Sequence, residues 1–125
     1  MTAPDPVNEL YPAAIWQAFM QPKHVGVLTD AAIGARVSDP LTLTELALGV
    51  QVRDGRIAAA AFKARGCPYT IGVLDLFLAE CIGQRLQDVG FDARLWSTRF
   101  CVPTERLTRL LLIDSAWREL QAQST

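Results

Sequence analysis

The sequence has few cysteines, a single histidine and no excess of positive charge. Its 125 residues include three cysteines, with no Cys-x-x-Cys pair among them. An odd, scattered set of cysteines predicts neither a disulfide framework nor a zinc knuckle, and is typical of a reducing compartment. The 12 basic residues are outnumbered by 13 acidic ones, so the basic face that nucleic acids require is missing. We therefore expect no nucleic-acid partner.

Long hydrophobic runs are also absent from the sequence. The longest, over 57–62, has six residues, whereas a membrane-spanning helix needs roughly 18. The first ten residues carry two acidic side chains and no basic one, while a secretory signal begins with positive charge. A lone histidine and the lack of a glycine-rich phosphate loop leave no machinery for hydrolysis. The sequence predicts a soluble cytoplasmic protein that has no membrane partner and is not an enzyme.

The composition favours one globular domain. Half of the residues are hydrophobic, and a chain of this length buries roughly two thirds of the surface that its unfolded form exposes. Pro4 and Pro6 indicate a flexible lead-in over 1–9. We expect a single domain over 10–121 and a short C-terminal tail over 122–125.

The first half of the sequence predicts one helix and three strands. Apolar side chains at helical spacing favour a helix over 11–20, and a short strand is expected over 32–37. Over 46–52 apolar residues alternate with small or polar ones, which is typical of a half-buried strand. An Asp-Gly pair then predicts a tight hairpin turn, so 57–63 is expected to form the returning strand despite its alanines.

The second half predicts two longer helices. The first extends over 68–81, with apolar residues recurring on one face. A helical turn over 84–89 and an irregular segment over 92–100 follow. The last helix is expected from residue 103 or 104 to about 121, with Asp114 interrupting its apolar stripe. This order predicts an α+β fold, in which a small three-stranded antiparallel sheet is covered by helices on one side.

Two of the cysteines lie where a helix is expected to begin. Cys67 stands between a strand end and a helix start, where the helix dipole favours a reactive thiolate. Cys101 precedes the last helix, and the two thiols could converge on one ion or cluster, although a closed metal site needs about four ligands. Cys81 is expected in the core and His24 in a connector. Four carboxylates are expected to face solvent, those of Asp75, Glu80, Asp88 and Asp92.

Several stretches of the sequence carry motifs that recur together in one family. Residues 21–26 read QPKHVG, close to Asn-Pro-Arg-Asn-Val-Gly, and a hairpin pattern follows over 48–57. Residues 62–67 read FKARGC and match Phe-Lys-x-x-Gly-Cys. Cys101 precedes the last helix, as a further cysteine does in that family. Over about 10–120 the chain resembles the iron–sulfur cluster assembly scaffolds of the IscU, SufU and NifU N-terminal family.

The resemblance implies a SufE/NifU-like fold and a role in iron–sulfur cluster biogenesis. It implies binding of a [2Fe-2S] cluster or of iron, with zinc as a further candidate ion. The ligand positions that it carries over are Cys67 and Cys101, with Asp39 as the acidic residue of the first-cysteine loop. A cysteine desulfurase and other assembly proteins are the implied partners.

The chain departs from the family pattern at two ligand positions. Ser38 stands at the place of the first cysteine, and Phe100 replaces the histidine before Cys101. The family's chaperone-recognition motif, Leu-Pro-Pro-Val-Lys, is absent, since 94–98 reads RLWST. Two thiolates and one carboxylate do not complete a [2Fe-2S] site in a monomer.

Three hypotheses follow from this reduced ligand set. In the first, the protein is a cluster scaffold that completes its ligands across a homodimer, from Asp39 or from an external thiol. In the second, Cys67 accepts sulfur as a persulfide, which Cys101 resolves. In the third, the protein docks assembly partners without holding a cofactor.

Overall fold

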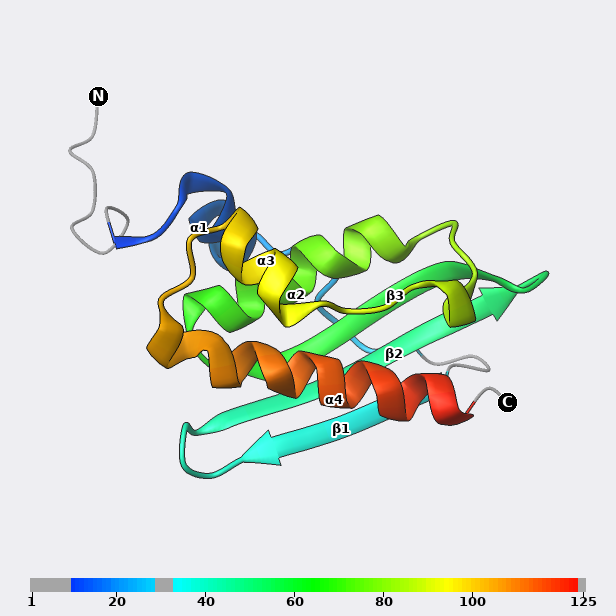
Figure 1. Cartoon of the computed structure of the whole chain (residues 1–125). Coiled ribbons are helices and arrows are strands. Elements are labelled where there is room, and N and C mark those ends of the chain that lie inside the picture. Colours follow the sequence, from blue (N-terminus) through cyan, green and yellow to red (C-terminus); the bar gives the residue numbers. More distant parts are fainter. Residues whose placement is uncertain (1–9, 29–32, 124–125) are drawn as a thin grey trace.

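The computed structural model of the chain describes residues 10–28 and 33–123. The lead-in expected over 1–9 and the chain end at 124–125 lie outside those residues, as does the predicted start of the first strand at residue 32. The described chain forms a sheet with helices laid across it (Figure 1).

The sheet contains three antiparallel strands in the order β1 (Ile33–Asp39), β2 (Thr44–Arg53) and β3 (Arg56–Arg65). The predicted hairpin between β2 and β3 is confirmed, and Asp54 and Gly55 form its turn with φ angles of 55° and 78°. Aspartate and glycine tolerate such positive φ angles better than most residues, so this pair fixes the turn. Turn chemistry and burial thus outweigh the helical preference of the alanines in β3.

Helices cover one face of the sheet (Figure 1). α2 (Pro68–Cys81) packs against β3, and α4 (Leu107–Gln123) packs against β1 and β2. In β2 the side chains of Leu46, Leu48 and Val50 are buried, and the residues between them are more exposed. A period of two places the apolar set on the face that the helices cover. The predicted α+β fold with a three-stranded antiparallel sheet is confirmed.

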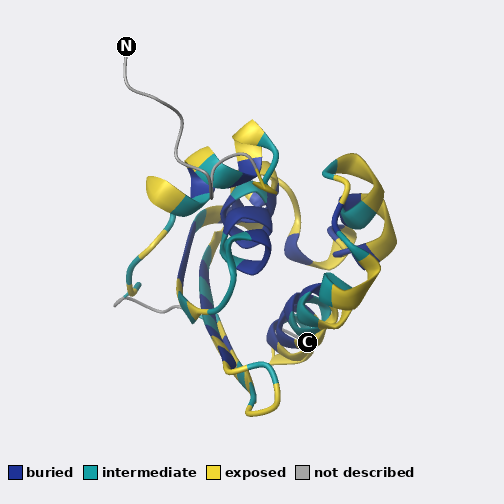
Figure 2. Cartoon of the chain, turned by 90° about the vertical axis from the view of Figure 1, so that its left-hand side faces the viewer, coloured by how far each residue is buried: buried dark blue, intermediate teal, exposed yellow. Residues whose placement is uncertain are grey.

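α2 is the central helix of the domain. Nine of its 14 residues are buried, more than the single stripe of a surface helix, and Figure 2 shows its ribbon mostly in the colour of buried residues. α1 (Ala13–Met20) packs across it. A Cβ added to Gly72 would lie 2.8 Å from the carbonyl oxygen of Ile15. Only glycine therefore lets the two helices approach this closely.

Asp75 lies on this buried helix, which corrects the expectation that its carboxylate faces solvent. The residue is 3% exposed, and its Oδ1 accepts hydrogen bonds from the backbone N–H groups of Lys23 and His24 at 2.9 and 2.8 Å. The expectation was wrong because backbone donors can replace water around a buried carboxylate. His24 is confirmed as a connector residue, and its carbonyl oxygen accepts a hydrogen bond from the N–H of Phe62 in β3.

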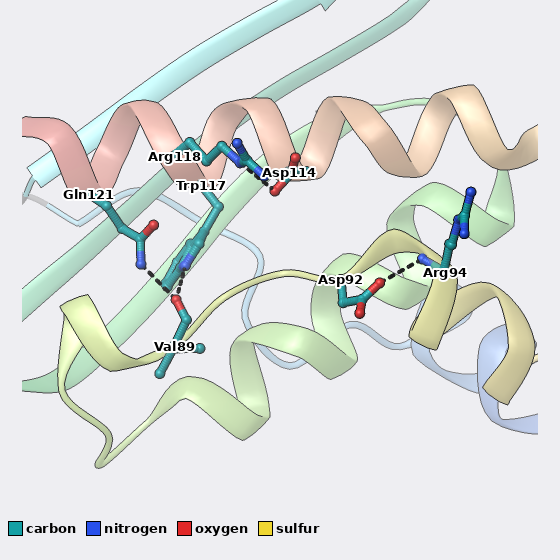
Figure 3. Close-up of polar contacts among 7 residues, drawn as sticks. All are labelled: Val89, Asp92, Arg94, Asp114, Trp117, Arg118 and Gln121. Carbon is teal, nitrogen blue, oxygen red and sulfur yellow. Dashed lines mark hydrogen bonds and ion pairs between the residues drawn. The ribbon is translucent and has the colours of Figure 1, made fainter.

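The segment expected to be irregular over 92–100 contains a helix, α3 (Ala93–Arg99). Oδ1 of Asp92 accepts a hydrogen bond from the backbone N–H of Arg94 at 3.0 Å (Figure 3). It accepts a second one from the backbone N–H of Leu95 at 3.2 Å. An aspartate in this N-cap position stabilises a helix by about 1 kcal/mol. The prediction was wrong because Asp92, although exposed as expected, is also a helix cap.

The predicted helical turn after α2 is present as the short helix η2 (Leu86–Asp88). The segment after it is tied to α4, where Nε1 of Trp117 donates to the carbonyl oxygen of Val89 at 2.8 Å and Nε2 of Gln121 donates to the same atom at 2.6 Å (Figure 3). The indole N–H is thereby satisfied although Trp117 is fully buried.

The last helix is confirmed, preceded by one turn of 3-10 helix, η3 (Thr104–Arg106). Asp114 does not interrupt its buried stripe, contrary to the prediction. Its side chain is 22% exposed and pairs with Arg118 at 3.1 Å one turn along the helix, while Ile113 and Ala116 are buried instead. The apolar face expected from the sequence is rotated by a fraction of a turn from the face of α4 that is buried in the structure.

Candidate functional site

Cys67 lies between the end of β3 and the start of α2, as predicted, and is the N-cap residue of α2. Its thiol is half-buried, and its carbonyl oxygen accepts the first helical hydrogen bond from the N–H of Ile71 at 3.1 Å. The start of α2, the β1–β2 turn and the start of α4 lie at one end of the molecule (Figure 1). We call this end, with its two cysteines Cys67 and Cys101, the thiol end.

The surroundings of Cys67 favour its thiolate. Burial alone would raise the pKa of the thiol, but the hydroxyl and backbone N–H of Thr70, the backbone N–H of Tyr69 and the side chain of Arg106 together lower it below its ordinary value. Sγ of Cys67 and Oγ1 of Thr70 lie 3.4 Å apart. The positive end of the helix dipole adds to this effect. The pKa of Cys67 is therefore lowered, which is the direction that its position before a helix predicts.

Cys101 lies in the connection between α3 and η3 and is exposed. Its φ angle is 54°, in the left-handed region that residues with a side chain rarely adopt. The next residue, Val102, is buried, and its N–H donates to the carbonyl oxygen of Ser97 at 2.9 Å. The turn is thus fixed by Val102 on its inner side, while Cys101 is held out to solvent.

Tyr69 lies near enough to both thiols for each to affect its pKa. Burial raises the pKa of this phenol, and the neighbouring Tyr11, Cys101 and Cys67 raise it further, whereas Arg106 lowers it. Electrostatic effects between such groups need close approach in a screened medium. The rings of Tyr11 and Tyr69 are 5.0 Å apart. Both cysteines therefore lie around one buried tyrosine, next to one arginine.

Asp39, the third residue of the predicted ligand set, is held within its own turn. It ends β1, and its Oδ1 accepts a hydrogen bond from the N–H of Leu41 at 3.1 Å. Its Oδ2 accepts a hydrogen bond from the hydroxyl of Thr42 at 3.0 Å. The carboxylate thus organises the β1–β2 turn, and it would have to give up these bonds to bind a metal ion.

The two substituted family positions have other surroundings. Ser38 is exposed on β1, one residue along from Val37, which packs against the core. Its side chain lines a surface hollow with Arg36 and Lys63 on the face of the sheet that α2 and α4 leave uncovered. The ring of Phe100 stacks on Trp96 at 5.6 Å between centroids. Neither position supplies a ligand to the thiol end.

Within residues 10–28 and 33–123, no group of three or more His, Cys, Asp or Glu side chains is arranged to hold a metal ion. The third thiol, that of Cys81, differs from the other two in its surroundings. It is fully buried at the C-terminal end of α2, and burial raises its pKa to about 12. Cys81 is confirmed as a core residue. The part of the chain that the structure describes therefore offers two accessible thiols and no complete site for a cluster or ion.

Sequence reasoning missed the residues that surround the thiols. Thr70 stands three residues after Cys67, the spacing at which an N-cap group meets the first helical turn. Arg106 lies five residues after Cys101, in the turn before the final helix. The Thr70 spacing could have been recognised, but nothing local indicates that Arg106 approaches Cys67 or that Tyr11 packs on Tyr69.

A sequence profile described as the NifU-like N terminal domain matches residues 10–108. This chain belongs to the NifU-like N-terminal domain family. A search of curated proteins gives no match. Proteins of this family act as scaffolds in iron–sulfur cluster assembly rather than as enzymes, and they typically bind such clusters. Membership implies partners within the assembly machinery.

Solved structures agree with this family fold. A proposed iron–sulfur cluster assembly scaffold protein for the SUF system from Fervidobacterium islandicum AW-1 has a TM-score of 0.68 at 15% identity, over 92% of this chain and 96% of that one. A crystal structure of a hypothetical protein has a TM-score of 0.67 at 19% identity, over 92% and 96%. The N-terminal part of a NifU-like protein from Brucella abortus has a TM-score of 0.53 at 18% identity, over 66% of this chain and 57% of that one.

At these low sequence identities the TM-scores show a shared fold and nothing about the site. None of the described helices is long and apolar enough to cross a bilayer. Cys67 and Cys101 carry thiols, which are ligand groups for soft metals, whereas Ser38 and Phe100 carry no such group.

Proposed function

We propose that this NifU-like domain is a cytoplasmic carrier of iron–sulfur cargo that binds a [2Fe-2S] cluster, or iron on the way to one, through Cys67 and Cys101. The observation that carries the proposal is the position of both thiols at the thiol end, with Cys67 at the N-cap of α2 and Cys101 just before η3, where both act on the pKa of Tyr69. Zinc suits the same soft ligands and is a competing ion. Asp39 is the candidate oxygen ligand, but its two hydrogen bonds make the thiols the stronger assignment.

The residues around Cys67 give the site its chemistry. The thiolate is the form that binds metals, and Thr70, the helix N-terminus and Arg106 all favour it. Cys101, just before η3, is exposed, so cargo bound there would be open to exchange with a partner. An open site suits a protein that passes cargo on, because a closed one would retain it.

A second candidate function rests on the same lowered pKa of Cys67. Its thiolate would attack the outer sulfur of a persulfide on a cysteine desulfurase, so that a new S–S bond forms on Cys67 and the desulfurase leaves as a thiolate. The Cys101 thiolate could then attack the Cys67 sulfur, so that a Cys67–Cys101 disulfide forms and the outer sulfur leaves as hydrosulfide. This sulfur-acceptor role needs only one partner and no metal.

Anaerobic reconstitution tests the cargo proposal. Wild type, Cys67→Ser and Cys101→Ser are incubated with iron, sulfide and a thiol reductant, and visible absorbance and iron are measured after desalting. Cys81→Ala is the matched control, because it removes a thiol that faces the core. Wild type and Cys81→Ala should retain iron and show visible absorbance, and the two serine variants should show neither. A colourless, iron-free wild type would refute cargo binding.

Mass spectrometry separates the remaining candidates. Incubation with a cysteine desulfurase and cysteine should add about 32 Da, one sulfur atom, to the peptide that contains Cys67 if the chain accepts sulfur. A wild-type protein that binds neither iron nor sulfur but still associates with the desulfurase would indicate a docking role instead.

A further inference from the structure

The hollow that Ser38 lines lies on the face of the sheet that the helices leave uncovered. Its volume is about 410 Å³, within the range of small-molecule sites, which is roughly 300–1,000 Å³. In β1 the exposed Arg36 follows the buried Ala35, and in β3 the exposed Lys63 follows the buried Phe62. Because neighbouring side chains of a strand point to opposite faces, Arg36 and Lys63 project from the uncovered face.

The strand register gathers three cationic side chains around this hollow. Arg36, Ala47 and Lys63 form one row across the three strands. Adjacent strands lie about 4.8 Å apart, so the backbones of Arg36 and Lys63 are about 10 Å apart, with only the methyl group of Ala47 between them. Arg65 lines the same hollow two residues further along β3, about 7 Å from Lys63 at the usual rise per residue. The three long side chains can therefore reach one group held above Ala47.

The positive charges of the hollow are not neutralised within the part of the chain that the structure describes. The ion pairs among those residues join helical side chains, and none involves Arg36, Lys63 or Arg65. Glu45, opposite Arg65 in the register, is the one carboxylate among the described residues that line the hollow. Like charges gathered on one face repel each other. The stability of the sheet therefore does not account for this cluster, and an anion would relieve the repulsion.

We propose that this hollow binds a small polyanion, whose phosphate or carboxylate oxygens accept charge-assisted hydrogen bonds from Arg36, Lys63 and Arg65. The two guanidinium groups present paired donors that match the oxygens of such an anion, and the ammonium group of Lys63 adds a point charge. Ser38, in the row next to Arg36, offers a hydroxyl as a further donor. The inference goes beyond the proposed cargo function, because it uses neither thiol.

The first experiment titrates the reduced, metal-free full-length chain with pyrophosphate and, separately, with citrate in a calorimeter. One probe carries phosphate groups and the other carboxylates, so the comparison shows which source of the anionic chemistry the hollow prefers. We expect saturable binding of at least one of them at low ionic strength. Raising the ionic strength from about 0.01 M to about 0.15 M shortens the Debye length from about 30 Å to about 8 Å and should weaken that binding severalfold.

The second experiment changes one charge of the hollow at a time. Arg36→Gln and Lys63→Gln each remove a charged donor and should weaken binding about tenfold. Glu45→Gln removes the carboxylate that repels the ligand and should tighten binding by about two- to fivefold. Arg94→Gln is the matched control, because it removes the same charge from an exposed position on α3, which packs on α4. The control should bind like wild type, and circular dichroism checks that all four variants are folded.

Four outcomes would overturn the inference. The first is a folded wild type that binds neither anion at low ionic strength. The second is equal weakening by Arg94→Gln and Lys63→Gln, which would show that net charge alone attracts the anion. The third is loss of binding in Cys67→Ser, which we expect to bind like wild type, because the anion would then lie at the thiols. The fourth is Lys63-dependent binding of hexaglutamate without binding of either small anion, which would assign the face to an acidic protein segment.

Discussion

The two ends of α2 carry the same side chain in opposite surroundings. At the N-terminal end Cys67 is half-buried, and its pKa is lowered by Thr70, backbone N–H groups and Arg106 against the opposing effect of burial. At the C-terminal end Cys81 is fully buried, and burial raises its pKa to about 12. One helix thus has a thiol of lowered pKa at one end and a thiol of raised pKa at the other.

The difference shows that position in the fold, rather than residue type, decides the chemistry of each thiol. The first turn of a helix offers unpaired N–H groups and positive potential, and the last turn offers neither. Cys81 behaves as a small apolar side chain in the core. The predictions below test this contrast, beginning with the largest expected effect.

The rate of alkylation should differ most between the two thiols. Burial raises the pKa of Cys81 to about 12, roughly 3 units above that of an ordinary thiol, whereas the pKa of Cys67 is lowered. The thiolate fraction at neutral pH should therefore be on the order of a thousandfold larger, or more, at Cys67 than at Cys81. Iodoacetamide followed by peptide mass spectrometry measures both rates in the metal-free folded protein. The rate at Cys67 should rise with pH and reach half its maximum at a lower pH than that of an ordinary thiol, because its pKa is lowered. Equal rates at the two positions would break the contrast.

Replacement by serine should affect the stability of the fold more at Cys81 than at Cys67, the reverse of their order in alkylation rate. Cys81→Ser buries a hydroxyl without a prepared partner and should lower the free energy of unfolding by about 1–3 kcal/mol. Cys67→Ser puts a preferred N-cap residue at the N-cap of α2 and should leave stability unchanged or raise it by up to about 1 kcal/mol. Urea unfolding followed by tryptophan fluorescence measures both. A larger loss at Cys67 than at Cys81 would contradict the assignment of roles.

Stability should also depend on the contact between α1 and the first half of α2. Gly72→Ala places a Cβ 2.8 Å from the Ile15 carbonyl oxygen and should cost about 1–3 kcal/mol through forced separation of the helices. Gly90→Ala is the control, because its added Cβ would meet nothing within 4 Å. Thermal unfolding compares the two variants, and a neutral Gly72→Ala would show that the helices can separate freely.

The smallest expected effect concerns the partner of the Cys67 thiol. Thr70→Val removes the hydroxyl 3.4 Å from Sγ and nearly keeps the side-chain volume, so the pKa of Cys67 should rise toward its ordinary value. The thiolate of Cys67 loses the stabilisation of one hydrogen bond, which is worth about 0.5–1.5 kcal/mol. Thr70→Ser keeps the hydroxyl and should retain the wild-type pH profile of alkylation. If both variants shift alike, the hydroxyl does not tune the thiol.

Much of the fold could be predicted because its signals are local. The alternation in β2 and the Asp54-Gly55 turn depend on neighbours in the sequence, and so does the position of Cys67 before Pro68. The N-cap of α3 is equally local, and its signal was overlooked because Asp92 looks like an ordinary surface charge. The burial of Asp75 was beyond reach, since it depends on N–H groups about fifty residues earlier.

Of the candidate site, the sequence indicated the two thiols but not the residues that surround them. Cys67 and Cys101 are marked by the helices that follow them, while the approach of Arg106 and Tyr11 is a product of the packing of α1, α2 and η3. Asp39 was expected as a ligand from its place in the family's loop. Its hydrogen bonds to Leu41 and Thr42 follow from the shape of the turn, which the sequence alone did not determine.

Protection of the thiols by bound cargo tests the central assignment most directly. Protein reconstituted with iron and sulfide, and the metal-free protein, are alkylated side by side under argon, and each cysteine is quantified by peptide mass spectrometry. The account predicts that loading protects Cys67 and Cys101 together, while Cys81 is unreactive in both samples. Iron-loaded protein in which Cys67 or Cys101 is alkylated as fast as in the metal-free protein would contradict it.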